Sequence, residues 1–137
     1  MMKKEYLRQE GYDLMGAAFE VSNEMGHGLS EDIYQECLEI ELADLKIPFQ
    51  SQVHLDVWYK EKKIHKTYIP DLLVYDEMLV ELKAVKELTA GHEKQLFNYL
   101  HITKKAVGYL INFGHPGKLE WKRIVLSEYI PSAEYPF

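Results

Sequence analysis

The 137-residue sequence predicts a single α/β domain over residues 1–137, with a mixed β-sheet flanked by helices. Apolar residues first recur at three- and four-residue intervals, which is typical of amphipathic helices. The pattern then changes to alternation and short apolar runs, which are typical of strands. The resulting order is helix, helix, strands, helix, strand, strand. Because no internal repeat or linker interrupts this order, we expect one domain with a mixed sheet.

Two helices are expected near the N-terminus. The first covers about residues 6–24, where apolar side chains lie along one helical face until the segment 26–28, Gly-His-Gly, interrupts the pattern. Ser30 is then a suitable N-cap for a second helix. This helix is expected to run to about Leu45, since Pro48 prevents any continuation.

Strands are expected to follow. Residues 49–66 alternate between apolar and polar side chains, which predicts a strand, a charged turn over residues 60–63 and a second strand over residues 64–69. The C-terminal part adds one helix and two strands. The first of these strands is an almost unbroken apolar run, which suits burial on both faces. In chain order, these last elements cover residues 90–102, with Thr89 as a cap, then 106–113 and 119–126, and the tail from Pro131 is expected to be a loop.

A β-hairpin with an informative set of polar residues is expected in the middle of the chain. Two apolar runs flank a short Asp76-Glu77 turn, which suggests antiparallel pairing. Because side chains on a strand point to alternate faces, Glu81 and Lys83 share one face and Leu82 points to the other. Asp71 starts the first strand, where the pairing can bring it opposite Glu81 or Lys83.

Two carboxylates and an ammonium group at one sheet edge suit the metal-assisted hydrolysis of a phosphodiester. Hard divalent cations such as Mg²⁺ or Mn²⁺ prefer oxygen ligands, which Asp71 and Glu81 supply. Lys83 can orient the attacking water or stabilise charge that develops on a phosphate. The plainer alternative is a structural ion pair between Glu81 and Lys83. A carboxylate among apolar strand neighbours is costly unless it is paired or binds a metal, and we favour the metal.

Three motifs resemble those of the PD-(D/E)xK nuclease superfamily, which includes restriction-endonuclease-like and RecB-type enzymes. The first has the spacing of the small GxxExxY family, the second is the motif that names the superfamily, and the third is the QxxxY element of RecB-type nucleases. In chain order, they are Gly28-Leu29-Ser30-Glu31-Asp32-Ile33-Tyr34, then Pro70-Asp71 with Glu81-Leu82-Lys83, then Gln95-Leu96-Phe97-Asn98-Tyr99. Each motif is weak alone, but the three together cover most of the chain.

The resemblance implies a restriction-endonuclease-like αβββαβ core with additional pieces at both ends. It also implies a metal site formed by Asp71, Glu81 and the backbone carbonyl of Leu82, with Glu31 as a further metal ligand or supporting carboxylate. Lys83, Glu81 and Asp71 would be the catalytic residues. The residues expected to bind or align the substrate are Gln95, Tyr99 and Tyr34.

Two of these features have plainer explanations. Glu31 and Asp32 are equally well placed to interact with a helix dipole, and only the motif spacing favours Glu31 as the site residue. The lysine-rich segment 60–66 is either a solvated hairpin tip that protects a strand edge or an arm that contacts phosphates. Of these two interpretations, we favour the hairpin tip.

Composition limits the class of protein. The net charge of −6 is unusual for a protein that binds nucleic acid, whose surface is usually basic. The excess is confined to residues 1–50, which carry 4 Lys/Arg and 11 Asp/Glu, whereas residues 51–137 carry 12 and 11. The sequence also shows no secretory signal and no membrane span, and Cys37 has no second cysteine to pair with. We therefore expect a cytoplasmic protein.

The leading hypothesis is a divalent-metal-dependent nuclease that acts on DNA, with RNA as the less favoured substrate. A non-catalytic nucleic-acid-binding or protein-interaction module that retains the nuclease fold is the main alternative. Hydrolysis of a small phosphate compound is a third, which a closed pocket would support. Because no module for reading sequence is evident, specificity is either low or supplied by a partner protein or by the second subunit of a homodimer.

Overall fold

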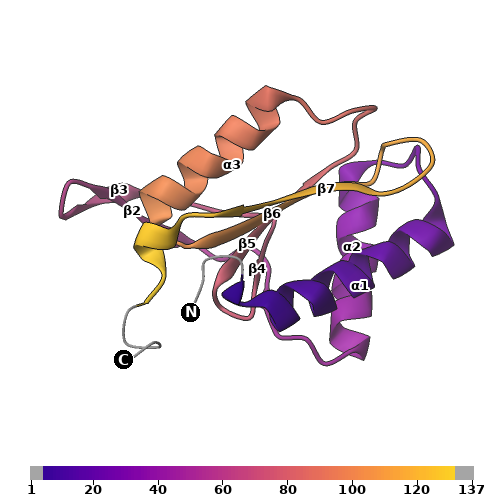
Figure 1. Ribbon diagram of the computed structural model, residues 1–137, viewed down its shortest axis with the longest axis horizontal. Coiled ribbons are helices and arrows are strands. Elements are labelled where there is room, and N and C mark those ends of the chain that lie inside the picture. Colours follow the sequence, from indigo (N-terminus) through magenta and orange to yellow (C-terminus); the bar gives the residue numbers. More distant parts are fainter. Residues whose placement is uncertain (1–4, 132–137) are drawn as a thin grey trace.

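The computed structural model describes residues 5–131 and arranges them in three layers (Figure 1). Helices α1 (Arg8–Met25) and α2 (Glu31–Asp44) cover one face of a five-stranded sheet, and α3 (Ala90–Thr103) covers the other. The predicted α/β class, with a mixed sheet flanked by helices, is confirmed and is consistent with a restriction-endonuclease-like fold. From residue 132 onward, the expected C-terminal loop lies outside the described residues.

The five-stranded sheet has the order β1-β4-β5-β6-β7. Strands β5 and β6 are parallel, and the other three neighbouring pairs are antiparallel. Parallel neighbours need a crossover connection, which α3 supplies. In chain order, the strands are β1 (Phe49–Gln50), β4 (Leu72–Val74), β5 (Met78–Lys83), β6 (Val107–Asn112) and β7 (Glu120–Val125), and a short 3₁₀ helix follows at Ser127–Tyr129.

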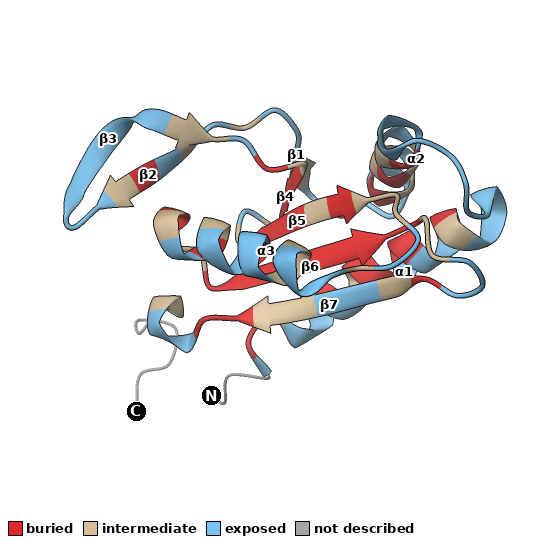
Figure 2. Cartoon of the chain, turned by 90° about the horizontal axis from the view of Figure 1, so that it is seen from above, coloured by how far each residue is buried: buried red, intermediate tan, exposed pale blue. Residues whose placement is uncertain are grey.

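Buried side chains form one cluster on each face of this sheet. Val80 and Leu82 belong to the cluster under α1 and α2, whereas Leu79 and Leu110 pack with Leu96 of α3 on the opposite face. Strand β6 is buried along its whole length, as its apolar run predicted (Figure 2). Alternate residues of β5 therefore face different layers, which decides where its polar residues point.

The segment 49–69 differs from the prediction. Instead of one strand before the charged turn, Phe49–Gln50 pairs with β4 in the main sheet, and Gln52 then adopts a left-handed backbone with φ of 60°. Strands β2 (Leu55–Tyr59) and β3 (Lys62–Tyr68) form a separate two-stranded sheet. Alternation identified extended backbone here, but it carries no information on which strand is the partner.

Two turns also lie at different positions from those expected. The charged turn is shorter than residues 60–63, because β3 already begins at Lys62. In the β4–β5 hairpin, Tyr75 and Asp76 are the left-handed residues, with φ of 54° and 63°. The loop covers residues 75–77, so it contains the expected Asp76-Glu77 turn and begins one residue earlier, at Tyr75.

The expected helix starts are confirmed. Thr89 accepts a hydrogen bond from the His92 backbone N–H at 3.3 Å, while His92 Nδ1 accepts one from the Thr89 N–H at 3.0 Å. This reciprocal pair caps α3. Ser30 precedes α2 as expected, but its hydroxyl donates to the Asp32 carboxylate and does not cap the backbone.

Candidate active site

Asp71 and Glu81 lie opposite one another at the end of the β4–β5 hairpin. The register pairs Leu72 with Val80, so the residue before Leu72 lies across from the residue after Val80. Asp71 Oδ2 also accepts a hydrogen bond of 2.7 Å from the backbone N–H of Leu82. The hairpin therefore brings the two carboxylates together, as the sequence pattern indicated.

The carboxyl group of Glu81 is desolvated. Burial raises the pKa of Glu81 from 4.5 to about 7, although the Lys83 ammonium and the Asp71 backbone N–H both favour its charged form. The negative charge of Glu31 raises this pKa further. Within residues 5–131, Glu81 Oε1 is buried without a hydrogen-bond partner. Such an oxygen is costly unless a cation or a donor arrives to satisfy it.

Asp71 lies in the same electrostatic environment. Burial raises the pKa of Asp71, the hydrogen bond from Leu82 lowers it, the charge of Glu31 raises it and that of Lys83 lowers it. Glu31 is exposed in the first turn of α2, yet its charge acts on both buried carboxyl groups. The structure therefore couples Asp71, Glu81, Lys83 and Glu31 electrostatically.

Leu82 presents its backbone at the same edge, while its side chain is buried under α1 and α2. The carbonyl oxygen of Lys83 accepts a hydrogen bond from the N–H of Phe113, on the β6 side. Because successive carbonyls of a strand point to opposite sides, the Leu82 carbonyl points toward Asp71. This direction suits the ligand role expected of it.

Gln35 is a site residue that the sequence analysis did not identify. Its Nε2 donates a hydrogen bond of 2.7 Å to the backbone carbonyl of Asp71. Gln35 lies four residues after Glu31, so the two project from one face of α2. That spacing was the available signal, but the contact depends on how α2 docks on the hairpin.

Tyr34 is fully buried. Its hydroxyl donates to the Gly26 carbonyl at 2.6 Å and accepts from the Leu29 N–H at 3.2 Å. Its ring stacks on Phe113, with a centroid distance of 4.8 Å. These contacts hold the turn before Glu31 against α2, and the expected contact of Tyr34 with substrate stays a prediction.

Gln95 and Tyr99 lie on α3, over the sheet face that carries Glu81. Gln95 is exposed, and the Tyr99 ring stacks on Tyr68 of β3 with a centroid distance of 4.0 Å. Within residues 5–131, neither side chain hydrogen-bonds to Asp71, Glu81 or Lys83. Their alignment of a substrate also stays a prediction.

Asn112 fixes the segment that follows Lys83, and the sequence analysis overlooked it. In the β5–β6 register, Asn112 pairs with Lys83. Its Oδ1 accepts from the N–H groups of Val85 and Gly114, each at 3.0 Å. Its Nδ2 donates to the Val85 carbonyl and to Glu120. A fully buried asparagine in an apolar run was the signal for this network.

The oxygen atoms at this edge form an open set. Among the described residues, no three His, Cys, Asp or Glu side chains are close enough to enclose an ion. Mg²⁺ usually binds through one or two carboxylates and keeps several waters or substrate oxygens. Asp71 and Glu81, with the Leu82 carbonyl beside them, fit that mode of binding, and the buried Glu81 Oε1 is available to it.

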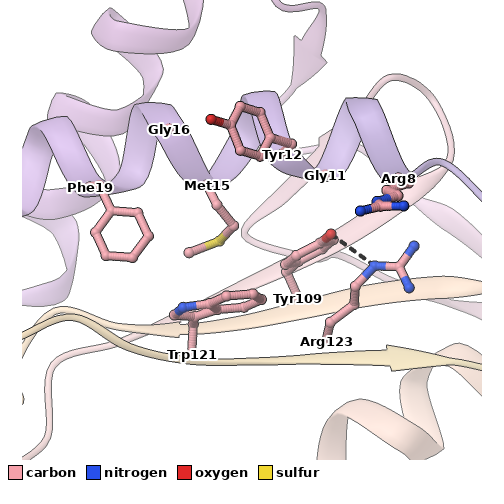
Figure 3. Close-up of a pocket in the computed structure, with 9 residues that line it drawn as sticks. All are labelled: Arg8, Gly11, Tyr12, Met15, Gly16, Phe19, Tyr109, Trp121 and Arg123. Carbon is pink, nitrogen blue, oxygen red and sulfur yellow. Dashed lines mark hydrogen bonds between the residues drawn. The ribbon is translucent and has the colours of Figure 1, made fainter. Parts of the chain in front are cut away.

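A hollow of about 540 Å³ lies on the opposite face of the sheet, between α1 and strands β6 and β7 (Figure 3). Aromatic and aliphatic side chains line most of it, and Tyr109 accepts a hydrogen bond of 2.9 Å from Arg123 Nε at one end. Asp71, Glu81 and Lys83 are not among its lining residues. The carboxylate site is therefore separate from this hollow.

Comparison with known proteins agrees with this geometry. Residues 8–124 match the family model of the PD-(D/E)XK nuclease superfamily. The chain belongs to the PD-(D/E)XK nuclease superfamily. PD-(D/E)XK nucleases typically use divalent metals, which fits the oxygen atoms at the hairpin. Membership in the narrower GxxExxY family and a single domain over residues 1–137 stay predictions.

The fold of this PD-(D/E)XK chain is similar to the crystal structure of SSO0001, with a TM-score of 0.52 and 18% sequence identity. The similarity covers 69% of this chain and 50% of that chain, and it concerns the fold alone. No curated protein matches the PD-(D/E)XK chain at a significant level. In the part of the chain that the structure describes, no helix is long and apolar enough to span a bilayer.

Proposed function

We propose that the chain is a divalent-metal-dependent nuclease that hydrolyses phosphodiester bonds of DNA. The observation that carries this proposal is the buried carboxylate oxygen of Glu81, which lies beside Asp71 and Lys83 and has no hydrogen-bond partner among residues 5–131. A folded chain rarely leaves such an atom unsatisfied unless a ligand completes it. Membership in the superfamily makes a nuclease-type function the coarse expectation, and the residues of this edge supply what hydrolysis needs.

Mg²⁺ or Mn²⁺ is the proposed cofactor. Asp71, Glu81 and the Leu82 carbonyl would hold it, with Glu31 assisting from α2. A bound divalent cation lowers the pKa of water and offsets negative charge on a phosphate. The Glu81 carboxyl group would ionise beside the cation, because an opposite charge nearby lowers a carboxyl pKa.

Lys83 would act on the reacting atoms. It shares a strand face with Glu81, and its charge lowers the pKa values of both Glu81 and Asp71. Its ammonium group has three donors and no acceptor. It is therefore suited to hold the attacking water and to stabilise the charge that develops on the phosphate oxygens.

The surrounding polar contacts would keep these groups in place. Gln35 fixes the backbone of Asp71, and Asn112 fixes the segment after Lys83. Functional side chains work best when neighbouring hydrogen bonds already hold them in the productive geometry. We infer that Gln35 and Asn112 are positioning residues for the two ends of the site.

A cleavage assay tests this proposal. Wild-type protein would be incubated with Mg²⁺ or Mn²⁺ and single- or double-stranded DNA or RNA, beside Lys83→Ala and the matched control Lys118→Ala. We expect wild type and the control to cleave DNA, and Lys83→Ala to cleave it at least about 100-fold more slowly. With EDTA present, no protein should cleave. Lys118 is exposed in the turn between β6 and β7, and its change to alanine removes the same charge as Lys83→Ala.

Two results would contradict the proposal. Wild-type protein that cleaves none of the four substrates would leave the non-catalytic module as the better account. Cleavage that persists in Lys83→Ala at the wild-type rate would show that Lys83 has no part in the reaction.

A further inference from the structure

The β2–β3 hairpin projects from the body of the molecule (Figures 1 and 2) and carries a net positive charge. Residues 54–68 carry four lysines and two acidic residues, a net charge of +2, whereas the whole chain has −6. The rest of the chain therefore carries −8. Residues 62–66 of β3 are all exposed. One projecting element of an acidic protein therefore carries a net positive charge.

Most of these lysines have no acidic partner in the part of the chain that the structure describes. Within residues 5–131, the hairpin has one ion pair, between Lys63 and Asp56 at 3.8 Å. Lys60 Nζ lies 5.6 Å from the ring centroid of Tyr59, a side chain that is 66% exposed. Lysines can protect a strand edge from pairing, but that role does not call for an exposed tyrosine beside them. Exposed lysines beside an aromatic ring are typical of surfaces that bind nucleic acid.

The hairpin is held firmly against α3. An isolated two-stranded hairpin is only marginally stable in water, so the position of the β2–β3 hairpin depends on its contacts with α3. The ring of Tyr68 stacks on Tyr99 at the base, and Val57 is buried. Lys104, at the end of α3, places its Nζ 4.9 Å from the ring centroid of Trp58. The chain therefore presents the lysines at a defined place.

The β2–β3 hairpin directly precedes the candidate active site in the chain. Strand β3 ends at Tyr68, three residues before Asp71. A seven-residue strand spans about 23 Å, so the exposed lysines extend about that far from the site. Phosphates along one strand of a duplex are about 3.4 Å apart along the axis, so this length corresponds to about seven nucleotides.

We propose that the β2–β3 hairpin is a substrate-binding arm whose lysines contact the phosphates of a nucleic acid beyond the cleaved bond. This inference rests on the proposed nuclease function and extends it to substrate binding. Such contacts are sequence-independent and depend strongly on salt. They explain how an acidic protein can bind a polyanion, since binding depends on the local charge that the substrate meets.

The test compares two triple variants with equal change in net charge. The arm variant is Lys60→Gln, Lys62→Gln and Lys66→Gln, which leaves the Lys63–Asp56 pair intact. The control is Lys46→Gln, Lys118→Gln and Lys122→Gln, three exposed lysines outside the hairpin. Binding of fluorescently labelled single- and double-stranded DNA would be measured by anisotropy at several salt concentrations, with Ca²⁺ as the divalent ion. Thermal melting checks that both variants are folded.

We expect the arm variant to bind at least about 10-fold more weakly than wild type. Its plot of log affinity against log salt should also be shallower by up to about 3 units, because each lost phosphate contact removes about 0.9. The control should stay within about 2-fold of wild type. Equal weakening in both variants, or in neither, would overturn the arm.

The same proteins separate this inference from the proposed function. If wild type cleaves DNA and the arm variant binds as tightly as wild type, the arm is wrong and the nuclease stands. If wild type binds through the arm but cleaves nothing, the arm stands and the nuclease is wrong. Wild type that neither binds nor cleaves nucleic acid would overturn both.

Discussion

A carboxyl group in a strand between Val80 and Leu82 lacks the water that would solvate its charge. Glu81 has Lys83 two residues away and Asp71 across the hairpin, yet its Oε1 has no hydrogen-bond partner among residues 5–131. Burial without full pairing raises a carboxyl pKa, because the neutral form loses less hydration free energy than the charged form when it leaves water. At this residue, local stability is given up for a group that can bind a cation.

The metal-free protein should therefore lose stability as the pH rises. The pKa of Glu81 is about 7 in the folded chain, whereas its ordinary value, which applies to the unfolded chain, is 4.5. Between pH 4.5 and about 7, the folded state therefore binds more protons than the unfolded state. The free energy of unfolding should fall across this window by up to about 3 kcal/mol and stay level above it. The raised pKa of Asp71 acts in the same direction.

Urea unfolding with EDTA, at intervals between about pH 4.5 and 8, would measure this effect in wild type and Glu81→Gln. The amide has the same shape and does not titrate, so most of the decline should vanish in the variant. The variant should also be the more stable protein at pH 8. Equal pH dependence in both proteins would show that Glu81 is not the titrating group.

At the scale of single elements, the segment between β5 and α3 depends on a close backbone contact. A Cβ atom at Gly114 would lie 2.5 Å from the carbonyl carbon of Ala84 and from the nitrogen of Val85. Both are backbone atoms, which cannot move aside as the end of a flexible side chain could. Because this backbone follows Lys83 directly, the absence of a side chain at position 114 helps to place Lys83.

We expect Gly114→Ala to lower the free energy of unfolding by about 1–3 kcal/mol and to slow cleavage, since overpacking would displace the segment after Lys83. Gly16→Ala is the control, because a Cβ at this helical position would have no atom of the described residues within 4 Å apart from its chain neighbours and the backbone of its own helix. That change should be neutral or stabilising by up to about 1 kcal/mol. If Gly114→Ala unfolds at the same urea concentration as wild type, the close backbone contact at Gly114 does not contribute to stability.

Periodicity was enough to predict most elements, but it was less informative on strand partners. The helices and the buried strand β6 were predicted because their signals lie within the element itself. The segment after Pro48 was predicted as one strand, yet it contributes to two sheets. That division depends on the left-handed backbone at Gln52 and on contacts with residues distant in sequence.

The candidate site divides in the same way. Asp71, Glu81 and Lys83 could be placed from the sequence, because alternation and one hairpin register decide their positions. Gln35 could not, because its contact with Asp71 joins two elements 36 residues apart in the chain. Asn112 likewise acts through tertiary contacts, which a single-sequence pattern does not specify.

At the scale of the whole molecule, the hydrophobic core places the candidate site, and charge is distributed unevenly over the chain. The hydrophobic clusters on the two faces of the sheet fix β5, whose end carries the polar groups of the site. The net negative charge is concentrated in residues 1–50, which include α1 and α2, and the β2–β3 hairpin projects at the opposite end of the molecule from α2 (Figure 1). Net charge alone would have argued against a nucleic-acid substrate, whereas its distribution favours one.

The measurement that tests the central claim most directly is the single-turnover rate of DNA cleavage by wild type and Glu81→Gln in Mn²⁺, at pH 8 and with saturating protein. The account predicts that Glu81→Gln cleaves at least about 100-fold more slowly, although it is the more stable of the two metal-free proteins at this pH. Opposite effects on rate and stability are expected only if the carboxylate serves the reaction. Cleavage by Glu81→Gln at the wild-type rate would contradict the account.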